Sequence, residues 1–77
     1  MRVLNVRADW DGEAGVWVVT SDDIPGLVTE AETAEQVTAK LRHMVPELIR
    51  ENGVDHGSGG ELPVEVTFHQ RLALHAA

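Results

Sequence analysis

The sequence has no cysteine and few basic residues, and each of these scarcities excludes a class of function. Without cysteine there is neither a disulfide framework nor a thiolate metal site. Six Lys and Arg stand against thirteen Asp and Glu, giving a net charge of −7. Such a field repels a phosphate backbone, so we expect no direct binding of nucleic acid.

Long apolar runs and targeting signals are also missing. No run approaches the roughly 18 apolar residues that a membrane span requires, and an alternating segment follows Met1 where a signal peptide would lie. We therefore expect a cytoplasmic protein that does not bind membranes. The 77 residues, 43% of them hydrophobic, predict a single domain over 1–77. A domain of this size has a small core and marginal stability, and self-association is a common way for such a domain to gain stability.

Three strands are predicted in the first half of the chain. Arg2–Trp10 alternates apolar and polar residues, which is typical of a strand with one buried side. Val16–Ser21 is apolar on both faces, as in a central strand that is covered on both sides. Leu27–Ala31 is a short strand, and the intervening Asp22–Gly26 has the composition of a tight turn.

One helix and a fourth strand complete the prediction. Thr33–Gln36 forms a capping box, and an apolar stripe continues in phase across Pro46 to the left-handed cap expected at Asn52–Gly53. A glycine-rich loop follows. Leu62–Phe68 is the last strand, with its even-numbered residues facing inward. A right-handed crossover then predicts an α+β fold of order β-β-β-α-β. Its mixed sheet has spatial order 3-2-1-4, and the helix lies on one face.

The segment GVWVVTSDDIPGLVTEAETAEQ, which joins two strands to a capped helix, resembles the HicB-like antitoxin family. The chain is most similar to the short, single-domain branch of uncharacterised function. The similarity extends back to Leu4 and Val6 and forward through LRHMVPELIRENG. It implies a truncated ribonuclease H-like sheet. It also implies an antitoxin that neutralises a small basic ribonuclease toxin, with a double-stranded-RNA-binding-like fold, by covering the toxin's catalytic histidine and RNA surface.

The chain departs from the longer members of that family after Phe68. The nine residues that remain are too few for a ribbon-helix-helix or helix-turn-helix segment. We therefore expect no C-terminal DNA-binding domain.

Catalysis is the rival interpretation, because a ribonuclease H-like sheet can carry a metal-dependent nuclease site. Two-metal chemistry needs three or four converging carboxylates. The sequence offers Asp9, Asp11, Glu35, Glu47 and Glu65, with none at the end of the fourth strand. The four histidines form no i, i+4 pair. We therefore expect no enzyme activity, no metal and no cofactor, with a minimal nuclease as the alternative.

Charge distribution is the first feature that indicates a partner. Eight carboxylates and no Lys or Arg lie between Asp9 and Ala39. The alternative to a docking surface is a solubilising one. The candidate partner-binding residues are Asp22, Asp23, Glu30 and Glu32, which we expect to be solvated and without a basic neighbour. Trp17 is the apolar complement if its ring lies on the face away from the helix. The partner would be a small basic toxin, steered by charge.

The second feature is an apolar sheet face that one helix cannot cover. The second strand places valines or Trp17 on the remaining face, and a second copy of the chain is the simplest cover. We therefore expect a homodimer or a tetramer. This feature keeps open a further alternative, an orphan dimeric regulatory or ligand-binding domain without a toxin.

Overall fold

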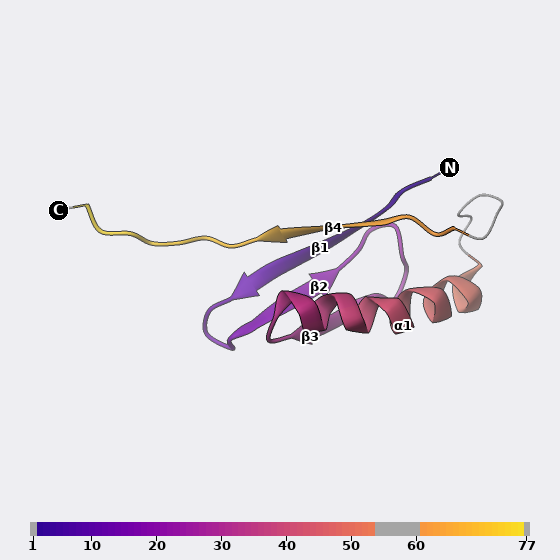
Figure 1. Cartoon of the computed structure of the whole chain (residues 1–77), viewed down its shortest axis with the longest axis horizontal. Coiled ribbons are helices and arrows are strands. Elements are labelled where there is room, and N and C mark those ends of the chain that lie inside the picture. The colour runs from indigo at the N-terminus through magenta and orange to yellow at the C-terminus, as the bar shows by residue number, and fades with distance from the viewer. Residues whose placement is uncertain (1, 54–60, 77) are drawn as a thin grey trace.

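A computed structural model describes residues 2–53 and 61–76 (Figure 1). Four strands and one helix follow the order β1, β2, β3, α1, β4. They span Leu4–Asp11, Val16–Thr20, Val28–Ala31, Ala34–Asn52 and Val64–His69. The strands form one mixed sheet of order β3-β2-β1-β4, so the predicted α+β fold and strand order are confirmed.

Strand pairing follows the predicted topology. β1 pairs antiparallel with β2 and parallel with β4, while β2 pairs antiparallel with β3. The hairpin between β1 and β2 is closed by Asp11, whose carboxylate accepts from the amides of Glu13 and Ala14 at 3.0 and 3.2 Å. The parallel β1–β4 pair requires the crossover that α1 provides. Residues 54–60 of the predicted glycine-rich loop lie outside the described residues.

Both ends of α1 have the expected caps. The Thr33 hydroxyl accepts from the Gln36 amide at 3.1 Å, and the Gln36 side chain accepts in return from the Thr33 amide at 3.2 Å. Gly53 caps the other end at φ 63°, where glycine carries no steric penalty. The helix continues through Pro46, as predicted. It is not long and apolar enough to cross a membrane, and it is the one helix in the described residues.

The core lies between α1 and one face of the sheet. It is built from Leu4, Val6 and Ala8 of β1, with Val19, Ala31 and the apolar stripe of α1: Val37, Leu41, Val45 and Ile49. The turn between β2 and β3 contributes as well, because Ile24 and Leu27 are fully or almost fully buried. This turn is therefore part of the core, although its composition indicated only a surface connection.

The helix covers the sheet unevenly. α1 packs over β2 and β3 rather than over β4 (Figure 1). Val64 and Val66 consequently remain half-buried. Phe68, predicted to be buried with them, lies on the helix side but is 38% exposed. The prediction of a fully inward fourth strand is thus wrong at its end, because the helix does not reach it.

Candidate functional site

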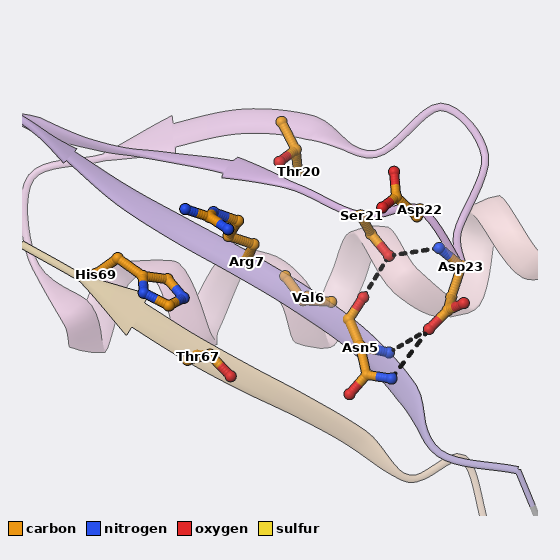
Figure 2. Close-up of a pocket in the computed structure, with 9 residues that line it drawn as sticks. All are labelled: Asn5, Val6, Arg7, Thr20, Ser21, Asp22, Asp23, Thr67 and His69. Atoms are coloured by element: carbon orange, nitrogen blue, oxygen red, sulfur yellow. Dashed lines mark hydrogen bonds between the residues drawn. The ribbon is translucent and has the colours of Figure 1, made fainter.

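The side of the sheet that faces away from α1, called the open face below, is covered by no element of the described chain (Figure 2). The strand register decides which side chains it presents. They are Asn5, Arg7 and Asp9 of β1, Val16, Val18 and Thr20 of β2, Val28 and Glu30 of β3, and Glu65, Thr67 and His69 of β4. The open face is therefore polar around a group of valines, of which Val28 is 70% exposed. The predicted uncovered face is present, but it is mostly polar rather than apolar, because its valines are confined to β2 and β3.

Hydrogen bonds fix one corner of the open face, where the β2–β3 turn meets β1. The Ser21 hydroxyl donates to the Asn5 carbonyl at 2.5 Å and accepts from the amides of Asp23 and Ile24 at 3.1 and 3.2 Å. The Asp23 carboxylate accepts from the Asn5 amide at 2.7 Å and from its side chain at 3.3 Å (Figure 2). Ser21 and Asp23 therefore hold the turn against the neighbouring strand and help to place Ile24 in the core.

Asp23 is consequently a structural carboxylate. The Asn5 amide, which donates to it, is the largest cause of a pKa below the ordinary value, and Arg2 at 3.2 Å adds to the effect. Hydrogen bonds to the charged form favour that form. The expectation that Asp23 is solvated and has no basic neighbour is wrong, because Arg2 is brought to it from outside the acidic segment by the fold.

A second ion pair lies near the centre of β1. The Arg7 guanidinium donates to both carboxylate oxygens of Asp9 at 3.0 and 2.8 Å. This hydrogen bond is the largest cause that lowers the pKa of Asp9 and raises the pKa of Arg7. His69 pairs with Asp9 in the β1–β4 register, so an imidazole lies beside this ion pair on the open face.

A shallow hollow of about 360 Å³ occupies the open face between these two groups. Arg7, Thr20, Asp22, Thr67 and His69 are among the residues that line it (Figure 2). It offers one guanidinium, one imidazole, hydroxyls and carboxylates. The chemistry is that of hydrogen bonding to a polar partner surface.

The carboxylates considered for nuclease chemistry do not converge. Asp11 caps its own hairpin, and Asp9 is paired with Arg7. Within residues 2–53 and 61–76, no group of three His, Cys, Asp or Glu side chains could hold a metal ion. The described geometry therefore supplies no two-metal centre.

The remaining predicted carboxylates are exposed but spread out. Asp22 follows β2, Glu30 lies in β3 on the open face, and Glu32 lies between β3 and α1. At about 3.3 Å per residue, β3 separates the Asp22 end from Glu32 by roughly 13 Å. Lys40 donates to the backbone carbonyl of Glu30, so a cation also lies beside this edge. The acidic residues form a rim along β3 rather than a cluster.

Trp17 lies on the helix side of the sheet, opposite Trp10 and Ala31 in the strand register. Its ring meets the rings of Trp10 and Phe68 edge to face, each at 5.2 Å between centroids. The condition under which Trp17 would serve as apolar complement on the open face is therefore not met. It is instead the middle of a cluster that contains all three aromatic residues of the chain and packs against the core.

Sequence reasoning missed the residues that shape this site. Ser21, Asn5 and Arg2 were not singled out, and neither were Arg7, Thr20 and His69 of the hollow. A Ser two positions before an Asp in a turn is a local signal for such a lock. The partners on β1 are remote in sequence, so only the strand register reveals them.

A family model described as a domain of unknown function, DUF1902, matches residues 3–76. The chain belongs to the DUF1902 family. A crystal structure of a hypothetical protein from the extremely thermophilic bacterium Thermus thermophilus is similar at 56% identity and a TM-score of 0.71. The match covers 97% of this chain and 100% of that one. No curated protein matches.

For a DUF1902 chain, function must therefore be argued from the site itself. The family match and the similarity to the thermophilic protein both extend over nearly the whole length of this chain. Neither description states a ligand, a partner or a reaction.

Proposed function

We propose that this DUF1902 domain is a noncatalytic protein-binding module, resembling the antitoxin of a HicA–HicB type pair, that neutralises a small basic ribonuclease. The observation that carries the proposal is the open face. It has half-buried valines on β2 and an exposed valine on the edge strand β3, lies uncovered in the described chain, and is bordered by acidic side chains along β3. A surface of this kind suits a partner that is basic and partly apolar.

The charge of the chain supports the same type of partner. At a net charge of −7, the domain attracts a basic protein over a Debye length of about 8–10 Å at ordinary salt. Asp22 and Glu30 are the carboxylates best suited to steering. Both are exposed, and neither side chain is held in a hydrogen bond described for this structure. Asp23 is excluded, because its charge is already used inside the fold.

Most of the apolar surface buried on binding the partner would come from the valines. Val16, Val18 and Val28 lie on adjacent strands of the open face, and apolar area removed from water supplies about 25 cal/mol per Å². The carboxylates would govern the association rate, and the valines the lifetime of the complex.

The test is a titration with the product of any short, Lys- and Arg-rich reading frame adjacent to the gene, at two salt concentrations. Asp22→Lys/Glu30→Lys should slow association at low salt, with a smaller effect at high salt. Glu47→Lys/Glu51→Lys makes the same change of charge on exposed residues of α1 and is the matched control. Equal association rates for both variants would reduce the acidic rim to a solubilising surface.

A second candidate is an orphan dimeric regulatory domain without a toxin. The observation that favours it is apolar surface away from the open face, namely Phe68, Leu72 and Leu74, which are exposed. Absence of any basic reading frame beside the gene, together with a stable homodimer, would favour this candidate.

A further inference from the structure

Residues 70–76 leave the body of the domain as an extended arm that continues the direction of β4 (Figure 1). The arm carries two large apolar side chains, Leu72 and Leu74, which are 65% and 84% exposed. Their spacing of two places both on the same side of an extended chain. Nothing in the described residues covers either leucine, so the arm presents apolar surface without an intramolecular partner.

The strand from which the arm departs has an unpaired edge. β4 is the last strand of the sheet and, within residues 2–53 and 61–76, pairs only with β1, beside which the Leu4 amide donates to the Pro63 carbonyl at 2.9 Å. Because backbone groups alternate in direction along a strand, those of Val64, Val66 and Phe68 point away from β1. No proline or lysine lies within β4 to block this edge. An open edge of this kind is a template for another strand.

An apolar groove of about 310 Å³ lies next to that edge, on the helix side of the sheet. Its apolar lining comes from Leu41, Val45 and Pro46 of α1 and from Leu62, Val64 and Val66. The groove exists because α1 packs over β2 and β3 and leaves β4 uncovered. It therefore offers an acceptor for apolar side chains that approach along β4.

We propose that β4 and residues 70–76 pair antiparallel with the same segment of a second copy of this chain, about a two-fold axis at His69. In this register, Leu72 of each copy lies opposite Val66 of the other, and Leu74 lies opposite Val64. The leucines of each arm then fill the groove of the other copy. The two sheets join into one continuous eight-stranded sheet.

The alternation of side chains along β4 and the arm is consistent with a second copy of the chain filling the groove. Val64 and Val66 are on the helix side, so the even-numbered Leu72 and Leu74 are on the helix side of the same extended strand. A two-fold axis perpendicular to the sheet keeps the helix faces of both copies on one side. The backbone groups that point away from β1 also belong to even-numbered residues, so the register pairs free groups with free groups.

Symmetry and charge favour a second copy over an unrelated peptide. One segment contains both the exposed leucines and the edge that would receive them, as an isologous interface requires. On the open face, Arg71 would lie opposite Thr67 and diagonal to Glu65 of the other copy. A diagonal pair of opposite charge in adjacent strands is favourable.

Cysteine cross-linking tests the register, and the chain has no cysteine of its own to interfere. His69→Cys places one thiol of each copy beside the proposed axis, directly opposite the same thiol of the other copy. Directly opposite residues have Cβ atoms about 4.5–5.5 Å apart, close to disulfide geometry. Mild oxidation at micromolar concentration should give a covalent dimer. Val28→Cys, on the exposed opposite edge of the sheet, is the matched control and should remain uncross-linked. Equal cross-linking of the two variants, or none in His69→Cys, would overturn the proposal.

Light scattering tests the arm itself. The wild type should have at least twice the 8.4 kDa chain mass, and Leu72→Asp/Leu74→Asp should have the monomer mass. Both leucines lie outside the core, so circular dichroism should show the variant folded. Val28→Asp should remain dimeric. A dimer that survives the loss of both leucines, or that is lost with Val28→Asp, would place the interface on the open face instead. A monomeric wild type would equally refute the proposal.

Discussion

Ile24 should contribute as much to stability as a core residue, although it lies in a turn, between Asp23 and Pro25. Its side chain is fully buried in the core between α1 and the sheet. Truncating a buried Ile to Ala costs about 2–5 kcal/mol, the spread reflecting how far the site collapses. A 77-residue domain has a total stability of about 4–12 kcal/mol at typical values per residue. Ile24→Ala should therefore remove a large share of it.

Urea denaturation followed by tryptophan fluorescence measures this cost, because Trp17 packs against the core and its ring contacts that of Trp10. A loss of about 3 kcal/mol shifts the urea midpoint by roughly 1–3 M and the melting temperature by about 12–24 °C. Protein concentration must be equal in all samples, since self-association raises apparent stability.

The matched control is Asp22→Ala, two positions away in the same turn. Asp22 is exposed, and an exposed substitution of this type changes stability by about 0.5 kcal/mol or less. If Ile24→Ala costs no more than Asp22→Ala, the turn is a surface connection as its composition indicated, and the packing described here is wrong.

Three further predictions concern α1 and the turn. Leu41→Ala should cost about 2–5 kcal/mol in urea denaturation, because Leu41 is buried at the middle of the helix stripe; a cost below about 1 kcal/mol would contradict that packing. Pro46→Ala should leave circular dichroism unchanged and stability equal or higher, since proline removes one helical hydrogen bond; unfolding would refute it. Asp23→Asn should be less stable than wild type at pH 7. Because the folded-state pKa of Asp23 is lowered, its contribution is present above the ordinary carboxyl pKa of about 3.9 and is lost as pH falls further. A stability difference that does not change between pH 7 and pH 2 would show that the charge of Asp23 is not used.

Strand order and helix limits were predictable from the sequence because their signals are local. The alternation in β1, the capping box at Thr33 and the Gly53 cap each involve residues within a few positions of one another. The handedness of the crossover comes from a general rule for parallel strands, which predicts the position of β4 beside β1. Predicted strand limits differ from the observed ones by one or two residues, as is usual for element ends.

The role of Asp23 could not be predicted, because its partners Asn5 and Arg2 lie 18 and 21 residues away. Composition alone places such a carboxylate on the surface. Ile24 is a similar case: neighbouring Asp, Pro and Gly residues indicate a turn, and only the tertiary structure shows that this turn folds back over α1. The Asn52 side chain donating to the Pro25 carbonyl at 3.3 Å marks that contact.

The face of the sheet on which Trp17 lies depends on the register of the hairpin formed by β1 and β2. Alternation groups Trp17 with Val19 and separates both from Val18, but it does not relate that pair to β1. The observed pairing of Trp10 with Trp17 places Trp17 on the helix side. The predicted strands leave residues 11–15 as a connecting loop, and a loop of that length allows more than one register, so this part of the candidate site became visible only in the structure.

The two proposed interfaces are compatible in space, and their combination predicts a stoichiometry. Pairing through β4 about an axis perpendicular to the sheet leaves both open faces on the same side. His69 would lie at that axis, and it also lines the hollow on the open face, so the hollows of two copies would adjoin. The dimer would therefore present two partner sites side by side while its arms fill the grooves on the helix side.

Wild type should accordingly bind a basic toxin as a 2:2 complex. Leu72→Asp/Leu74→Asp should bind the same toxin 1:1 with similar affinity per site, because neither leucine lies on the open face. Analytical ultracentrifugation of both mixtures distinguishes these masses. Loss of toxin binding in the folded monomeric variant would show that the same surface serves both dimerisation and toxin binding. A 2:1 complex in the wild type would instead mean that a single toxin spans the joined sheet across the axis.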